Sequence, residues 1–156
     1  MQQEKEQQYQ RAAECAAAIL SRRPLSAAML EKKLLDKEFT QDEAGYAVER
    51  MRVLGAVNDT AYAQLLLRSY ARKGSGVRKL RHEMWQRGVP DDIITQVLQD
   101  YEPDLEIMTA LLDKRLRGDV SDRKECEKAM AALQRRGFTF SQIREAMAQY
   151  RKQCAE

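Results

Sequence analysis

The sequence predicts an all-α protein built from three tandem three-helix repeats. Only seven Gly and three Pro interrupt 156 residues, and the abundant Ala, Leu, Glu, Lys, Arg and Gln all favour helix. One pattern of apolar residues also recurs three times, at steps of 50 and 49 residues. Repeats of this size are typical of helical arrays, in which each unit buries its apolar face against its neighbours. We therefore expect an elongated, curved array of the right-handed type.

The recurring pattern is visible when three segments are aligned. They are LEKKLLDKEFTQDEAGYAVERM (30–51), LRHEMWQRGVPDDIITQVLQDY (80–101) and AMAALQRRGFTFSQIREAMAQY (129–150). Apolar positions match across the three copies, as in Leu34, Met84 and Leu133. A basic residue precedes each bend, at Lys37, Arg87 and Arg136. Agreement in register, and in the helix-capping signals that follow each bend, favours true repetition over a chance likeness of amphipathic helices.

Helix start signals divide the chain into nine elements. The predicted helices span about 5–21, 26–37, 41–54, 59–73, 76–87, 91–101, 104–117, 122–136 and 140–152, to within a few residues. Thr40 with Glu43, and Thr139 with Gln142, have the spacing of capping boxes. Pro90 fits the first turn of a helix. The repeats are predicted at 1–57, with a polar N-terminal extension, at 58–102, which is the basic repeat, and at 103–156.

Composition excludes several classes of protein. The content of 44% hydrophobic and 33% charged residues indicates a folded chain. No apolar run is long enough to cross a membrane, and the polar N-terminus does not resemble a signal peptide. Three widely separated cysteines do not form the even set of a secreted disulfide framework. We expect a cytoplasmic monomer that makes no contact with membranes.

One stretch, RSYARKGSGVRKLRHEMWQRG (68–88), holds most of the excess positive charge. Its only acid is Glu83, and its cations are Arg68, Arg72, Lys73, Arg78, Lys79, Arg81 and Arg87. An isolated charge run is more often a solvated face than a binding site. A merely solvated face, however, usually mixes both signs to relieve repulsion. We therefore predict that these seven residues bind an acidic partner, which is protein, nucleic acid or both.

The glycine turn within this stretch raises a phosphate-binding hypothesis. The sequence KGSGVRK lacks the Lys and Ser/Thr that a phosphate loop needs after its last glycine, and a helix rather than a strand precedes it. What remains is a helix N-terminus at 75–78, flanked by cations, that could hold a phosphate or carboxylate. Trp85 borders the basic surface and could stack on a base or anchor a partner. Burial in the core is the favoured interpretation for a lone tryptophan at the edge of an apolar stripe.

Residues for catalysis or metal binding are missing. His82 is the only histidine, so one chain has no Ser-His-Asp arrangement and no histidine-based metal site. Cys126 lies between Glu125 and Glu127, whose charges oppose formation of a thiolate. Asp91 and Asp92 stand at a helix start, where carboxylates stabilise the helix dipole. We predict a protein that is not an enzyme and that uses no cofactor or metal.

Two segments resemble the RecX family of bacterial recombination regulators. They are SRRPLSAAMLEKKLL (21–35) and LGAVNDTAYAQLLLRSYARKGSGVRKLRHEMWQRGV (54–89). The matching residues are Arg23, Ser26, Asn58, Asp59, Tyr62, Ala63, Lys73, Gly74, Lys79, Leu80, Glu83 and Gly88. The third repeat fits by its length and by the bend at 135–138. The chain departs from the family at Glu38, where Gly is common, at GSG, where Gly-Pro is common, and at Met84, where Leu is common.

The resemblance implies a modulator of the RecA recombinase in DNA recombination, repair and the SOS response. Such a protein would lie in the groove of the RecA filament on DNA and restrain ATP hydrolysis, strand exchange and filament extension. Its basic stretch would then face acidic protein surface and DNA phosphate. The same surface would also suit stabilisation or remodelling of the filament. Two alternatives remain, a stand-alone DNA-binding repeat protein and a helical scaffold for an unrelated acidic protein.

Overall fold

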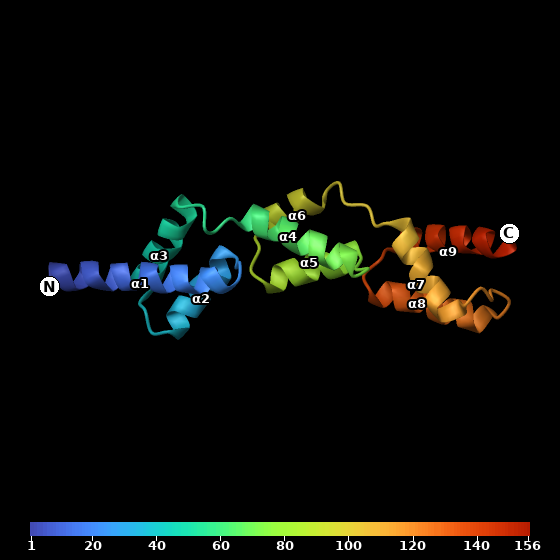
Figure 1. Ribbon diagram of the computed structural model, residues 1–156, viewed down its shortest axis with the longest axis horizontal. Coiled ribbons are helices and arrows are strands. Elements are labelled where there is room, and N and C mark those ends of the chain that lie inside the picture. Colours follow the sequence, from blue (N-terminus) through green and yellow to red (C-terminus); the bar gives the residue numbers. More distant parts are fainter. The chain divides into compact units, whose positions relative to one another are not determined.

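The computed structural model describes all 156 residues as nine α-helices joined by short turns, with no strand (Figure 1). The helices are α1 (Gln2–Arg22), α2 (Ala27–Asp36), α3 (Gln41–Val53), α4 (Asp59–Arg72), α5 (Val77–Gln86), α6 (Asp91–Leu98), α7 (Leu105–Leu116), α8 (Arg123–Arg135) and α9 (Phe140–Ala155). The all-α prediction is confirmed, and each of the nine predicted helices is present.

The largest differences from the predicted boundaries are three residues. Helix α1 begins at Gln2 rather than near 5, so the polar N-terminal extension is itself helical. Its Gln and Glu residues are good helix formers, which accounts for the extra turn. Helix α6 ends at Leu98 rather than near 101. The Tyr101 hydroxyl instead donates a hydrogen bond to the backbone oxygen of Ser75, at 3.1 Å, and Pro103 follows.

The chain divides into two compact units. The first comprises Met1–Leu65 and Met84–Val97, and the second comprises Leu66–Glu83 and Leu98–Glu156. The boundary passes through α4 and α5, so each unit holds part of the second predicted repeat. The repeat limits at 57 and 102 stay a prediction.

Alanines let the helices of the first repeat approach closely. Ala12 and Ala16 of α1 are fully buried, as are Ala44 and Ala47 of α3. Small side chains on both helices bring the backbones together, while larger residues of α2 and α3 fill the remaining core. These are Leu30, Leu34, Val48 and Met51. The predicted Thr40 capping box at the start of α3 is confirmed, with both hydrogen bonds present.

The N-terminus of α2 is where the first repeat joins the second. The Ser26 side chain, which is fully buried, accepts from the Met29 backbone and donates to the backbone oxygen of Arg87. The Asp59 carboxylate accepts from the Ala27 backbone N–H at 2.9 Å. Gly88 has a φ of 79°, and a Cβ there would lie 2.9 Å from the Cβ of Ala28. The bend between α5 and α6 therefore seats directly on α2.

The second unit contains the same kind of joint. The Gly76 backbone N–H donates to the Arg136 oxygen at 2.8 Å, and the Arg78 N–H donates to the Gly137 oxygen at 3.1 Å. In the repeat register Gly76 corresponds to Ser26, and Arg136 corresponds to Arg87. Equivalent backbone carbonyls of the two bends are thus bound in both joints. The Ser26 hydroxyl binds that of Arg87, and the Gly76 N–H binds that of Arg136. Stacking of successive repeats through this bend is a recurring feature of the fold.

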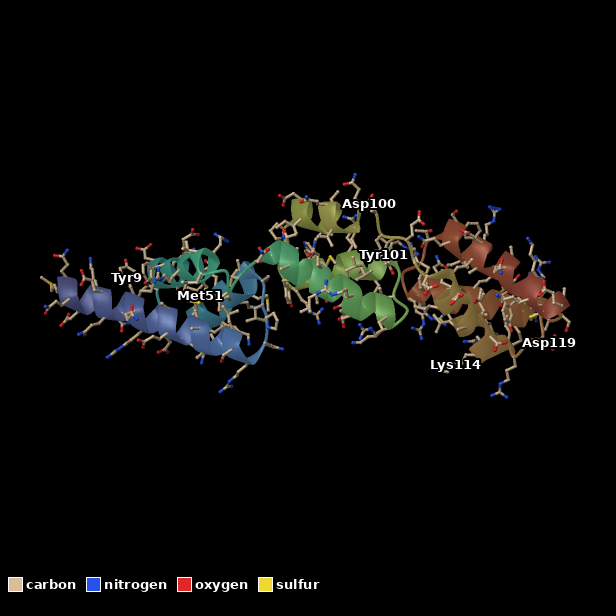
Figure 2. The ribbon with its side chains drawn as sticks, turned by 45° about the horizontal axis from the view of Figure 1, so that its top comes forward. Tyr9, Met51, Asp100, Tyr101, Lys114 and Asp119 are labelled. Carbon is tan, nitrogen blue, oxygen red and sulfur yellow. The ribbon has the colours of Figure 1, made fainter.

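The third repeat has its own core, formed by α7, α8 and α9. Phe138 and Leu133 are each 1% exposed, and the Thr139 capping box at the start of α9 is confirmed. The loop after α7 contains Asp119, labelled in Figure 2. Hydrogen bonds from the Ser121 hydroxyl and backbone N–H lower the pKa of Asp119. This local turn leads the chain into α8.

Tyr150 of α9 ties this loop to the core. Its hydroxyl accepts from the Gly118 N–H and donates to the Asp113 carboxylate, each at 2.8 Å. Burial raises the pKa of Tyr150 to about 12, and the bond to Asp113 adds to the rise. The ordinary value is 10.0. Because the folded state holds this proton more tightly than the unfolded state, its contribution to stability is complete below pH 10.0 and is lost as pH rises toward 12.

We expect the free energy of unfolding to fall between about pH 10 and 12, measured by urea denaturation at stepped pH. Tyr150→Phe removes two hydrogen bonds and should cost about 1–3 kcal/mol at neutral pH. The same substitution should also make the free energy of unfolding fall less steeply between about pH 10 and 12. Burial, with the nearby Asp104, raises the pKa of Tyr101 as well. Adding Tyr101→Phe to the Tyr150→Phe variant should therefore remove part of the alkaline fall in the free energy of unfolding that remains in that variant. An unchanged slope in Tyr150→Phe would contradict this assignment.

Candidate functional site

The basic stretch forms a helical hairpin, made of α4, a short turn and α5, with the two helices side by side (Figure 1). The Tyr70 hydroxyl on α4 donates to the Glu83 carboxylate on α5 at 3.0 Å, which ties the helices together. Leu66 on α4 and Leu80 on α5 are buried. The apolar faces therefore point inward, and the intervening charged positions point to solvent.

Six of the seven predicted contact residues are exposed on this hairpin. They are Arg68, Arg72, Lys73, Arg78, Lys79 and Arg81, and we call them the α4–α5 cations. Glu83, the only acid of the stretch, is half-buried and bonded to Tyr70. The six α4–α5 cations therefore outnumber the single acid of this stretch. The seventh residue, Arg87, is half-buried in the first unit, and its backbone oxygen accepts from Ser26.

Two of the α4–α5 cations also have structural partners. The Arg78 guanidinium donates to the Phe138 oxygen at 3.1 Å. The Lys73 ammonium lies over the Tyr70 ring, 5.2 Å from its centre. Arg68, Arg72, Lys79 and Arg81 have no structural partner of this kind and present their charge at the surface. These four are the strongest candidates for contact with an acidic partner.

The predicted anion site at the N-terminus of α5 is wrong. Ser75 and Gly76 are buried, and the N–H groups of Gly76 and Arg78 already donate to the bend at Arg136 and Gly137. A tertiary contact therefore covers this helix end and takes up two of its N–H donors, so the end does not form an open site for a phosphate. The sequence prediction missed Arg136, whose guanidinium donates to the Lys73 oxygen at 3.2 Å. Arg136 precedes the third bend at the position equivalent to Arg87, and this equivalence could have indicated its role in the joint.

The favoured interpretation of Trp85 as a core residue is also wrong. Its exposed fraction is 62%, whereas the adjacent Met84 is fully buried. An exposed tryptophan ring offers a flat apolar surface of the kind that stacks on bases or anchors a protein partner. This feature adds an apolar element to the outer surface of α5.

Several residues that carry the family resemblance hold the fold together. Asn58 accepts from the Ala61 N–H at 3.1 Å at the start of α4, and Asp59 caps α2. Ser26 and Gly88 form the joint between the repeats. Glu38 stands at the first bend, at the position equivalent to Gly88, with a φ of 73°. It is exposed, so this bend has space for a side chain. At Gly88 there is no such space. The exposure of Glu38 leaves room for a side chain at this departure from the family.

None of the helices combines the length and apolar character needed to cross a membrane.

Family models for the three RecX three-helix domains match residues 12–51, 58–98 and 102–147, as the first, second and third domains respectively. Together these matches include the joints at α2 and α5 and the whole basic hairpin.

Individual relatives agree with this assignment. The regulatory protein RecX of Trichlorobacter lovleyi is 35% identical over 138 residues, which cover 83% of this chain and 89% of the relative. The RecX protein of Chlorobium phaeobacteroides is 32% identical over 142 residues, covering 89% and 93%. These relatives are named as regulatory proteins rather than as enzymes.

Solved structures show the same fold. The crystal structure of RecX from Lactobacillus salivarius superposes with a TM-score of 0.86 at 19% identity, covering 93% of this chain and 97% of that one. A second RecX crystal structure gives a TM-score of 0.79 at 20% identity. The sequence relatives, the domain matches and the repeated joints lead to one conclusion: this chain belongs to the RecX family of regulatory proteins.

Proposed function

We propose that this protein binds the RecA nucleoprotein filament and inhibits its ATP hydrolysis, strand exchange and extension. The α4–α5 cations carry the proposal, because six exposed cations face solvent beside one acid that is already hydrogen-bonded. Acidic protein surface and DNA phosphate are the partners that such a surface attracts. The chain works as a monomer in the cytoplasm and acts by binding rather than by catalysis.

A repeated architecture suits this task. Several weak contacts within one chain gain affinity, because each contact raises the effective concentration of the next. The three repeats can therefore bridge successive filament subunits without any single tight contact. In this proposal the second repeat supplies the charge, and the flanking repeats supply further contacts.

A stand-alone DNA-binding function is the second candidate. The exposed Trp85 favours it, because base stacking on aromatic rings is common in proteins that bind single strands. The α4–α5 cations would then contact phosphates directly, and binding would weaken steeply with salt. The two functions differ in whether the recombinase is needed.

A titration of RecA ATP hydrolysis on single-stranded DNA separates the two functions. We expect salt-sensitive inhibition at well below one molecule of this protein per RecA subunit, because blocking growth at a filament end requires few molecules. DNA affinity without RecA is measured in parallel by fluorescence anisotropy. Inhibition that begins only when the DNA is saturated would show competition for DNA and would overturn the filament proposal.

A further inference from the structure

A groove of about 590 Å³ lies between α1 and α2. Three residues of α1 supply its apolar part, namely Cys15, Ala18 and Ile19. Cys15 and Ile19 are half-buried, so the groove has an apolar floor within reach of solvent. Grooves of this size accommodate a side chain together with a short length of backbone.

Four cations line the groove together with this floor. They are Arg22, Arg23, Lys33 and Lys37, and one acid, Asp36, lines the groove with them. None of the four makes a salt bridge to Asp36 or to any other carboxylate. Cations near helix C-termini stabilise the helix dipole, which accounts for part of this distribution. Stabilisation of the helix dipole does not account for the apolar floor that lines the groove with these cations.

We propose that this groove, the α1–α2 groove, binds an acidic peptide segment of a partner protein, with one apolar side chain of that segment seated on the floor. Carboxylates spaced along an extended peptide can pair with the cations of the groove lining. A leucine-sized side chain between them would bury apolar surface against Ile19 and Ala18. Charge and shape thus point to the same occupant.

A nucleic-acid backbone fits the groove less well. Phosphates carry no apolar group for the floor, and the Asp36 carboxylate repels phosphates and peptide carboxylates alike. The same carboxylate can accept a hydrogen bond from a peptide N–H. Acidic peptide is therefore the occupant that uses all of the groove lining.

The cysteines provide a direct measurement. Cys15 lines the groove, whereas Cys154, also half-buried, lies in the third repeat, and Cys126 is buried. A short synthetic peptide of glutamates with one central leucine should slow alkylation of Cys15 by iodoacetamide and leave Cys154 unaffected. Mass spectrometry of the two cysteine-containing fragments gives both rates from one sample. The experiment uses the full chain without recombinase, so its result is independent of the proposed function.

Charge reversal tests the role of the cations. Lys33→Glu with Lys37→Glu should lower the peptide affinity by about tenfold or more, because two attractive ion pairs become repulsive. Lys5→Glu with Lys32→Glu changes the net charge equally at exposed positions outside the groove lining and should leave the affinity unchanged. Circular dichroism must show the same helix content in both variants.

Three outcomes would overturn the proposal. Equal protection by an all-glutamate peptide would show that the floor is not used. Equal protection by single-stranded DNA would assign the groove to phosphate rather than peptide. Protection of Cys15 that appears without peptide as the protein concentration rises would indicate a second copy of this chain as the occupant.

Discussion

Replacing Gly137 by alanine is expected to destabilise the second unit by about 3–5 kcal/mol. Gly137 has a φ of 95°, which strains any side chain. A Cβ there would lie 2.5 Å from the Lys79 nitrogen and 2.7 Å from the Lys79 Cβ. Because the obstructing atoms belong to the α5 backbone region, rotation of a side chain cannot relieve the clash. The bend must withdraw from α5, which breaks the bonds to Gly76 and Arg78.

Two other glycines provide matched controls. Gly118 has a φ of 85° but no heavy atom within 4 Å of its Cβ position, so Gly118→Ala should cost only about 1 kcal/mol from backbone strain. Gly45 lies within α3 and is also open, so Gly45→Ala should stabilise the chain by about 0.5–1 kcal/mol. Urea denaturation followed by circular dichroism gives all three values. Equal losses for Gly137→Ala and Gly118→Ala would show that the joint contributes nothing to stability.

Reversing Arg68 and Arg72 to glutamate is expected to raise the concentration for half-inhibition of RecA ATP hydrolysis by roughly tenfold or more. The two side chains lie one helical turn apart on the exposed face of α4. Their reversal turns attraction to an acidic surface into repulsion and slows association. Neither side chain contributes to the buried core, so helix content and resistance to urea should stay near those of the parent protein.

The control for this variant is Lys32→Glu with Arg50→Glu. It carries the same change in net charge at exposed positions of the first repeat. Inhibition should stay within about twofold of the parent, because long-range charge is screened at physiological salt. Unchanged inhibition by the Arg68→Glu, Arg72→Glu variant would remove the α4–α5 cations from the interface. An equal loss of inhibition in both variants would indicate that the partner responds to the net charge of the protein rather than to the α4–α5 cations.

The sequence by itself determined the local structure. Helix ends depend on residues within one turn, so the capping boxes at Thr40 and Thr139 could be predicted from the spacing of two side chains. The repeat register depends on apolar residues that recur along the chain, and it correctly indicated three sets of three helices. Exposure of Arg68 and Arg72 also followed, because charged residues four apart form one stripe on an amphipathic helix.

Only the tertiary structure decided which turns and helix ends are buried. A free N-terminus at Gly76 and a core position for Trp85 were both reasonable from their neighbours in sequence. The first is instead closed by a bend some 60 residues away, and the second lies at the surface with 62% exposure. Stacking of repeats brings together backbone groups that no local pattern links. The physical reason is that burial depends on which helix faces meet, whereas sequence periodicity specifies only which face each helix would bury.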